Sequence, residues 1–386
     1  MIPVSMLVRG TYPCAQQPVD IDVRQGRVHG IYSAGAGAAD AGGVDALIAP
    51  GLFDIQVNGA RGIDMGAHDL SPDRVHALNA YLLSRGVFRW VPTLVTDSVD
   101  ALEHKCRVLN EALQDRALAR HIPGIHLEGP HISPQDGPRG AHPAAHVLPP
   151  DLKLFTRLQR AAGGHILYVT VAPELPGALS FIRALVSRGV VVALGHHGAG
   201  PKEIHAAADA GARLCTHLGN GMASMIHRHQ NPLWPQLAED RLQASVIADL
   251  QHVPPDLLNV ILRVKGPRGI ILVSDSVLLA GMKPGQYSLF GGEVEMKRNG
   301  RICLAGTDLL AGSSLLLPEA VFNTARVTDM SLAAAFAAAS RNPARLLGVP
   351  LPSWPPRPGR PAEFVLYPGP DASGKRNPKP LLVFTA

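Results

Sequence analysis

Residues 189–220 of the chain read GVVVALGHHGAGPKEIHAAADAGARLCTHLGN. This stretch contains two short apolar runs, separated by a segment whose apolar residues recur at helical spacing. Continuously apolar strands joined by a helix are typical of a parallel sheet that is covered on both faces. Each run leads to a histidine, His196 after the first and His217 after the second. The stretch therefore predicts a strand–helix–strand unit with a polar side chain after each strand.

The same alternation extends over residues 51–276, where apolar runs are separated by helical patterns such as 71–86 and 201–211. The eight runs are LFDIQV (52–57), GVFRWVPTLV (86–95), IPGIHLEG (122–129), HILYVTVAPE (165–174), GVVVALGHH (189–197), ARLCTHLGN (212–220), ASVIADLQH (244–252) and GIILVSDS (269–276). Eight such units predict an α/β fold of the (β/α)8 TIM-like barrel type, with a doubly wound open sheet as the alternative.

Both ends of the chain have a different pattern. Residues 1–50 alternate apolar and polar residues around turn signals, as in VDIDVRQGRVHG. The C-terminal part contains two more short apolar runs, in RPAEFVLYP and PLLVFTA, after a proline-rich connector. We expect residues 1–50 and 355–386 to form one small β-sandwich domain beside a barrel of residues 51–354.

The amino-acid composition bears on the size of the core and on the partners of the protein. The 386 residues are 46% apolar, which is enough for a large core, and the formal net charge is +5. The basic residues are scattered and aromatic residues make up only 5%, so we expect no nucleic-acid partner. A small anionic substrate agrees with the mild basic bias.

Cysteine usage and the N-terminal sequence bear on location. The four cysteines lie far apart without a CxxC motif, which is typical of reduced thiols in a cytoplasmic protein. No apolar run approaches the ~20 residues that span a bilayer, and the N-terminus lacks the order of a signal peptide. We therefore expect a cytoplasmic protein without a membrane partner.

Five of the eight predicted strands lead to a titratable residue, namely Glu128, His196, His217, His252 and Asp275. In a parallel barrel the carboxyl ends of all strands surround one mouth, so these side chains should converge. One carboxylate and two imidazoles, from Glu128, His196 and His217, suit a divalent metal with a fourth position open for water. Leaving such groups buried without partners would cost several kcal/mol.

A metal at this position predicts a hydrolase. The ion would polarise a carbonyl group and acidify water, while Asp275 would accept the proton of the attacking water and deliver it to the leaving amine. Each residue also has a structural alternative, because a single strand-end histidine is more often a hydrogen-bonded structural group. Glu128 could cap a helix or pair with Arg139, and Asp275 could cap a helix. The combination favours hydrolysis of an amide.

An ordered set of motifs resembles the N-acetylglucosamine-6-phosphate deacetylase family of the amidohydrolase superfamily. The motifs are PGLFDIQVNG (50–59), GIHLEGPHI (124–132), RGAHP (139–143), VALGHH (192–197), CTHLGNGM (215–222), VIADLQHV (246–253), LVSDS (272–276), LAGSSLLL (310–317) and SRNPARLLG (340–348). They cover nearly the whole chain in the family's order, and together they are far more specific than any one of them.

The resemblance implies that Glu128, His196 and His217 are the metal ligands and that Asp275 is the catalytic acid/base. The substrate-binding positions that it implies are His142, the backbone N–H groups of Asn220 and Gly221, Arg228 and His252 for a 6-phosphate, and Leu310, Ala311 and Gly312 for the sugar. In the family the arginine comes from the neighbouring subunit, so the resemblance also implies a homodimer.

The first predicted strand bears on the number of metal ions. Many amidohydrolases have an HxH motif there and bind two metals, whereas this chain has Gln56-Val57-Asn58. Amide side chains are weaker ligands than imidazoles, so we expect one divalent ion, with zinc as the first candidate.

The chain departs from the family pattern at positions that touch the substrate pocket. These are Gly219 to Met222, the segment HRHQN at 227–231, and His197 in place of a small hydroxyl residue. Imidazoles at His197, His227 and His229 could tune the pocket towards another anion. The prediction is hydrolysis of the N-acetyl group of an N-acetylhexosamine, with N-acetylglucosamine 6-phosphate as the first candidate. The alternatives are another N-acyl substrate, or a non-catalytic binding protein that retains the fold.

Overall fold

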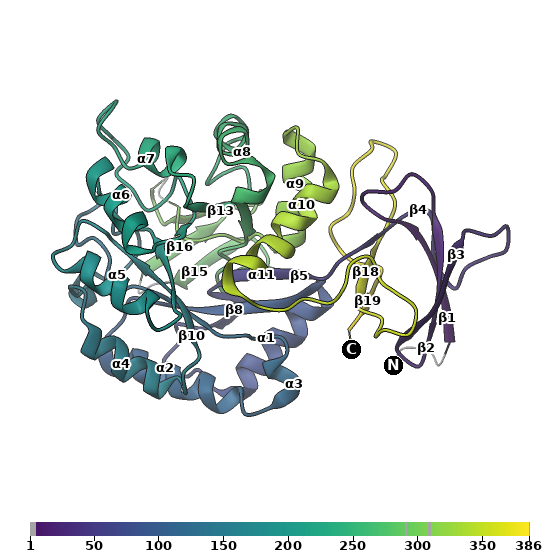
Figure 1. The fold of residues 1–386 in the computed structure, drawn as a ribbon, viewed down its shortest axis with the longest axis horizontal. Coiled ribbons are helices and arrows are strands. Elements are labelled where there is room, and N and C mark those ends of the chain that lie inside the picture. Colours follow the sequence, from purple (N-terminus) through teal and green to yellow (C-terminus); the bar gives the residue numbers. More distant parts are fainter. Residues whose placement is uncertain (1–4, 290–291, 308–309, 386) are drawn as a thin grey trace.

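The computed structural model describes residues 5–289, 292–307 and 310–385. Figure 1 shows a large unit in which strands are surrounded by helices, and a smaller β unit beside it. Both chain termini lie at the smaller unit.

The large unit is built on an eight-stranded parallel barrel. Its strands, in spatial order, are β5 (Leu52–Val57), β8 (Val87–Val95), β9 (Ile125–Glu128), β10 (Ile166–Val171), β11 (Val191–Leu194), β12 (Leu214–Cys215), β13 (Gln243–Ile247) and β14 (Ile270–Val273). A parallel bridge between Val57 and Ser276 brings the last strand back to the first. The backbone N–H of Asp275 also donates to the carbonyl of Gln56 over 3.0 Å. All eight predicted strands are confirmed, and the barrel replaces the open-sheet alternative.

Helices cover the outside of the barrel (Figure 1). They are α1 (Pro72–Ser84), α2 (Val99–Ala112), α3 (Arg116–Ala119), α4 (Leu152–Ala161), α5 (Ala178–Val186), α6 (Pro201–Ala210), α7 (Leu233–Ala238), α8 (Pro255–Gly269), α9 (Leu317–Val327), α10 (Leu332–Ala338) and α11 (Arg341–Leu347). The two helices predicted from 71–86 and 201–211 are confirmed. The first begins after the N-cap Ser71, and the second ends at Gly211, whose φ of 112° lies in the left-handed region.

The small unit is a six-stranded sheet that both ends of the chain build together. In spatial order it contains β19 (Leu382–Phe384), β18 (Phe364–Tyr367), β4 (Ala41–Ala49), β1 (Ser5–Thr11), β2 (Val19–Arg24) and β3 (Arg27–Ser33). Side chains from both chain ends, such as Ile21, Ile48 and Phe364, share one apolar core. The small β unit is thus confirmed, while the division of the chain at residues 50 and 354 stays a prediction.

A three-stranded antiparallel sheet, which was not predicted from the sequence, follows β14. It consists of β15 (Gly285–Leu289), β16 (Gly292–Met296) and β17 (Ile302–Leu304). The segment after it returns to the barrel, where Ser313 forms a parallel bridge with Ser276 next to Asp275. Shorter elements are the strands β6 (Gly59–Ala60) and β7 (Ile63–Asp64) and the 3-10 turn η1 (Ala144–His146). Within the described ranges, no helix has both the length and the apolar character needed to cross a membrane.

Candidate metal and substrate site

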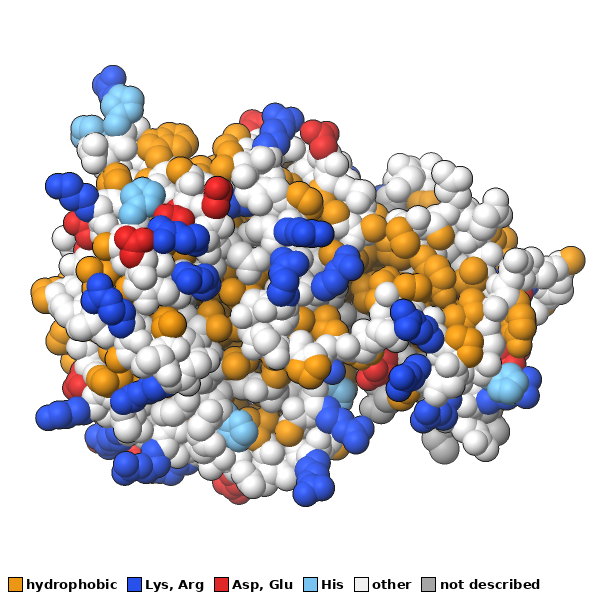
Figure 2. Space-filling view, viewed as in Figure 1, with side chains coloured by type: hydrophobic (Ala, Val, Ile, Leu, Met, Phe, Trp, Pro, Cys, Tyr) orange, Lys and Arg blue, Asp and Glu red, His pale blue; other side chains and the backbone are white. Residues whose placement is uncertain are grey.

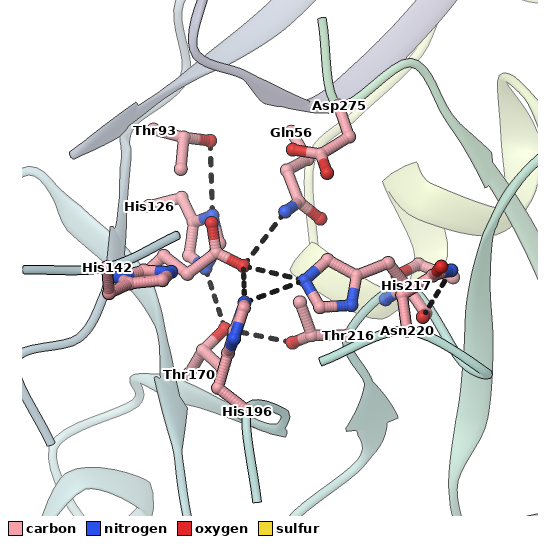
Figure 3. A network of polar contacts seen from close by, with 12 residues as sticks. Gln56, Thr93, His126, His142, Thr170, His196, Thr216, His217, Asn220 and Asp275 are labelled. Carbon is pink, nitrogen blue, oxygen red and sulfur yellow. Dashed lines mark hydrogen bonds and ion pairs between the residues drawn. The ribbon is translucent and has the colours of Figure 1, made fainter. Parts of the chain in front are cut away.

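The polar side chains predicted from the strand ends lie together at the carboxyl end of the barrel. Glu128 is the last residue of β9, whereas His196, His217 and Asp275 each follow the end of β11, β12 or β14 by two positions. These four residues and His252 line one cavity of about 230 Å³. Figure 3 shows His196 and His217 pointing towards the centre of a network of polar contacts. The convergence expected of a parallel barrel is therefore present.

Three of these residues have unusual backbone conformations. The φ angles of His196, His217 and Asp275 are 52°, 32° and 49°, in the left-handed region that residues with a Cβ seldom adopt. Such conformations cost of the order of 1–3 kcal/mol each and are concentrated at functional sites. At the end of a strand they turn the chain sharply, and the side chains of these three residues line the cavity.

Three atoms that carry lone pairs converge in the cavity wall. Nε2 of His217 lies 3.0 Å from Oε1 of Glu128 and 3.0 Å from Nε2 of His196, and the remaining separation is 3.3 Å. Ligands held about 2.0–2.1 Å from a tetrahedral zinc are roughly 3.3 Å apart. The spacing and the set of one carboxylate and two imidazoles therefore fit a divalent metal ion.

Neighbouring groups fix the orientation of these ligands. Nδ1 of His196 lies 3.0 Å from the backbone carbonyl of Pro138. Because a carbonyl only accepts hydrogen bonds, Nδ1 carries the proton and the lone pair of Nε2 is free for a metal. Oε1 of Glu128 also accepts a hydrogen bond from Nε2 of Gln56 over 3.0 Å. The first barrel strand thus supplies a donor to the ligand carboxylate.

The charge of the site favours a cation. Burial raises the pKa of Glu128, but its close contacts with the imidazoles of His196 and His217 outweigh burial and hold this pKa well below its ordinary value. Burial lowers the pKa of His217, but the hydrogen bond to Glu128 outweighs it and raises this pKa. Glu128, which is one of the three metal-binding residues, therefore stays ionised although it is buried.

Asp275 is a second, partly buried carboxyl group on the same cavity. Burial, followed by the nearby charge of Glu128, raises the pKa of Asp275 to about 6. Nδ2 of Asn58 donates a hydrogen bond to Oδ1 of Asp275 over 2.8 Å. A carboxyl group with a pKa close to neutrality is suited to accepting and returning a proton at physiological pH.

Ten of the twelve residues predicted from the sequence line the cavity. Besides the metal-binding group and Asp275, these are His142, Asn220, Gly221, His252, Leu310 and Gly312. Ala311 does not line it, because its side chain is fully buried in the core of the three-stranded insert. Arg228 does not line it either, because it lies in an exposed segment of the loop after β12.

His142 and Gly221 lie directly beside the metal-binding imidazoles. Nδ1 of His142 hydrogen-bonds with Oγ1 of Thr96 over 2.9 Å, and its ring lies edge-on to that of His196 with 4.3 Å between centroids. Gly221 has a φ of 58°, and a Cβ there would lie 3.0 Å from Nδ1 of His196 and 3.1 Å from Cε1 of His217. Glycine therefore allows the backbone to approach both ligands closely.

His252 is held from behind by a carboxylate. Its Nδ1 lies 2.7 Å from Oδ2 of Asp249, and Oδ1 of Asp249 accepts the backbone N–H groups of Gln251 and His252 over 2.9 and 2.8 Å. Burial raises the pKa of Asp249, but the hydrogen bond with His252 outweighs it and lowers this pKa. The pair fixes the orientation of an imidazole on the cavity wall.

The loop that carries Arg228 projects from the molecule. Figure 2 shows basic and histidine side chains at the tip of a projection in the upper left, above α6 and α7. The loop also exposes apolar side chains, since Met225 is 92% and Ile226 39% exposed. Of the three additional imidazoles, His227 and His229 are exposed on this loop, whereas His197 is buried and does not line the cavity.

A buried histidine that was not among the predicted site residues lies below the metal-binding group. His126 is fully buried, its ring stacks on Tyr168 at 3.8 Å, and it hydrogen-bonds with Thr93 and Thr170 over 3.1 and 2.8 Å (Figure 3). Burial lowers the pKa of His126 to about 3, so the imidazole is neutral. The available signal was its position two residues before Glu128, because alternate residues of a strand share one face.

Comparisons with known proteins extend these observations, although no protein-family model matches the chain. The chain is 35% identical over 320 residues to N-acetylglucosamine-6-phosphate deacetylase of Bos taurus, covering 80% of this chain and 76% of that protein. It is 33% identical over 319 residues to N-acetylgalactosamine-6-phosphate deacetylase of Escherichia coli O157:H7, covering 83% of each. A solved structure of a mutant N-acetyl-D-glucosamine-6-phosphate deacetylase from Mycobacterium smegmatis, in complex with N-acetyl-D-glucosamine-6-phosphate, has a TM-score of 0.84 at 29% identity and covers 97% of each chain.

Proposed function

Because the chain belongs to the N-acetylglucosamine-6-phosphate deacetylase family, we propose that it hydrolyses the N-acetyl amide of an N-acetylhexosamine 6-phosphate. The products are acetate and the amino sugar phosphate, and N-acetylglucosamine 6-phosphate is the first candidate substrate. The observation that carries this proposal is the convergence of Glu128, His196 and His217 beside the carboxyl group of Asp275.

We infer that Glu128, His196 and His217 hold one divalent ion, with zinc as the first candidate. When bound, the ion supplies Lewis acidity towards the amide carbonyl and towards water. Two observations support one ion: Gln56 donates its amide N–H to Glu128, and Asn58 donates its amide N–H to Asp275. The amides of the first strand thus act as hydrogen-bond donors to carboxylates.

Asp275 is proposed to move the proton that the reaction requires. A water molecule adds to the carbonyl carbon, and the carboxylate of Asp275 accepts its proton. The same carboxyl group then gives this proton to the amide nitrogen as the C–N bond breaks, which releases acetate and the free amine. The hydrogen bond from Asn58 holds one oxygen of Asp275, so the other oxygen is available for the transfer.

We propose that His142, the backbone N–H groups of Asn220 and Gly221, Leu310 and Gly312 bind the sugar and that His252 binds its 6-phosphate. The position of Arg228 supports a homodimer, since it lies outside the cavity of its own chain on a loop with exposed apolar side chains. In that dimer the partner subunit's Arg228 would complete the phosphate site. A guanidinium group can bind phosphate through two parallel hydrogen bonds.

We also propose a cytoplasmic location, which the four unpaired cysteines support.

The proposal is tested by measuring acetate release after metal removal and reconstitution. The purified protein is stripped with a chelator, reloaded with one equivalent of zinc, and assayed on N-acetylglucosamine 6-phosphate, N-acetylgalactosamine 6-phosphate and both unphosphorylated sugars. We expect activity to return with zinc and kcat/KM to be higher for the phosphorylated sugars. Equal turnover with and without phosphate would remove the phosphate site from the proposal. A reloaded protein without activity on any of them would overturn the deacetylase function.

A further inference from the structure

A second cavity, of about 680 Å³, lies where the barrel, the three-stranded insert and the loop between β18 and β19 meet. Its wall comes from the turn after β13, the turn between β16 and β17, one side of α9, and residues 374–378. None of the twelve residues assigned to the metal and substrate site lines it. The volume falls within the range of small-molecule sites, about 300–1,000 Å³.

The charge available to a ligand in this cavity is positive. Arg326, Lys375 and Arg376 all line it. Arg326 donates a hydrogen bond to Oδ1 of Asn323, and Arg376 donates hydrogen bonds to the backbone carbonyl groups of Asp45 and Pro368. These uncharged partners orient the two guanidinium groups, and the carboxylates of Asp45 and Asp371, which do not line the cavity, offset the charges of Arg376 and Lys375 only from outside it. Cations that line the wall of a concave site attract anions.

The two carboxyl groups of the cavity are engaged by the protein. Asp249 binds Nδ1 of His252 and two backbone N–H groups. Oε2 of Glu319 accepts the backbone N–H of Leu316 over 2.8 Å, and burial raises the pKa of Glu319, which favours its neutral form. The acidic groups therefore offset the three cations only in part.

Gln251 supplies a hydrogen-bond acceptor, which favours a ligand that carries hydrogen-bond donors. Its Nε2 donates to the backbone carbonyl of Asn299 over 3.2 Å, which fixes the amide. Its Oε1 is buried and has no hydrogen-bond partner among the residues that the structure describes. An unsatisfied buried acceptor costs about 1–3 kcal/mol, and a ligand hydroxyl group would satisfy it. The cavity thus suits a molecule with an anionic group and hydroxyl groups.

We propose that this cavity is a second ligand site for a small hydroxylated anion of the sugar-phosphate class, and that the Asp249–His252 pair connects it to the metal site. Asp249 lines the larger cavity, His252 lines the smaller one, and the 2.7 Å hydrogen bond between them crosses the wall. A ligand hydroxyl group that bonds to Asp249 competes for the carboxylate that orients His252. Occupancy of the second site then changes substrate binding at the first. This second part rests on the proposed function.

Binding is tested by calorimetry with glucose 6-phosphate, which has no N-acyl group and is not deacetylated. The metal-loaded protein is compared with Arg326→Glu and Lys375→Glu, and the matched control is Arg160→Glu, an exposed residue of α4 that receives the same change of charge. We expect Arg326→Glu and Lys375→Glu each to lower the affinity for glucose 6-phosphate at one class of sites by roughly tenfold or more. The control Arg160→Glu should leave this affinity unchanged. Identical binding in all four proteins, or binding of inorganic phosphate as tight as that of glucose 6-phosphate, would overturn the assignment.

The connection is tested through the KM of the deacetylation reaction at rising glucose 6-phosphate. Simple competition at the metal site raises KM equally in the wild type, Arg326→Glu and Asp249→Asn. The proposal instead predicts that glucose 6-phosphate changes the KM of the wild type by an amount that differs from its effect on the two variants. This additional change should be lost in both Arg326→Glu and Asp249→Asn. Equal effects in all three would refute the connection. The calorimetric result does not depend on turnover, so failure of the deacetylase proposal would be distinguishable from failure of the second site.

Discussion

Replacement of Gly221 by alanine tests whether the backbone approaches the metal-binding imidazoles as closely as the structure places it. A Cβ on this residue would lie 3.0 Å from Nδ1 of His196 and 3.1 Å from Cε1 of His217. The left-handed backbone costs a residue with a Cβ about 1–2 kcal/mol, and overpacking typically adds ~1–3 kcal/mol. We therefore expect the free energy of unfolding to fall by about 2–5 kcal/mol.

Gly348→Ala is the matched control. Gly348 has a φ of 66°, against 58° for Gly221, and nothing lies within 4 Å of the Cβ position. Its expected cost is the backbone contribution alone, about 1–2 kcal/mol. The difference between the two variants measures the contact with the imidazoles. The contact weakens zinc binding if it destabilises the metal-bound form more than the metal-free form. Each 1.4 kcal/mol or so of that difference lowers the zinc affinity by about tenfold.

Two measurements are needed on each variant. Urea unfolding of the metal-free and zinc-loaded proteins gives the change in stability, and competition with a chelator gives the zinc affinity. We expect Gly221→Ala to lose more stability than Gly348→Ala and to bind zinc less tightly. If the two variants lose equal stability and both bind zinc like the wild type, the close approach of residue 221 to the ligands is refuted.

The remaining predictions concern catalysis, metal and phosphate. Asp275→Asn should retain zinc, measured by metal analysis, but lower kcat by about 10²–10⁴-fold, because the proton carrier is lost. Since burial raises the pKa of Asp275 to about 6 and a base works in its ionised form, kcat/KM should fall as pH drops below that value; a decline confined to pH below 3.8, the ordinary aspartate value, would contradict this. His217→Ala should lose stoichiometric zinc as well as activity in the same metal analysis. Arg228→Ala should raise KM for the phosphorylated sugar much more than for its unphosphorylated analogue, and equal changes would remove its phosphate role.

The barrel could be predicted because its strands are buried on both faces and therefore read as continuous apolar runs. All six residues of β5 are buried, for example. The insert of β15 to β17 could not be predicted in this way. Its strands GQYSL and GEVEM contain glycine and polar residues, and they cover only a small core around Val277 and Val294. A short strand that buries few side chains carries little hydrophobic pattern.

The residue types of the site could be predicted, but the directions of the side chains could be predicted only in part. Glu128, His196, His217 and Asp275 converge because strand ends converge in a barrel, which follows from the topology. Residues 310–312 were predicted together to bind the sugar, but they do not all face the cavity. Leu310 and Gly312 line it, whereas the side chain of Ala311 packs in the core of the insert. The left-handed conformations of the strand-end residues depend on tertiary contacts and leave no mark in the sequence.

The contacts between the metal ligands also imply a competition between metal and protons. In the structure Nε2 of His217 lies 3.0 Å from Oε1 of Glu128, and this contact raises the pKa of the imidazole. The same nitrogen lone pair must be free to bind a metal, so metal uptake has to displace the proton that stabilises the ion pair. The ring of His196 is held by a second contact, because its Nδ1 donates to the backbone carbonyl of Pro138 over 3.0 Å. We therefore expect the zinc affinity to fall as pH is lowered and His217 takes up a proton, which competition with a chelator at several pH values would measure.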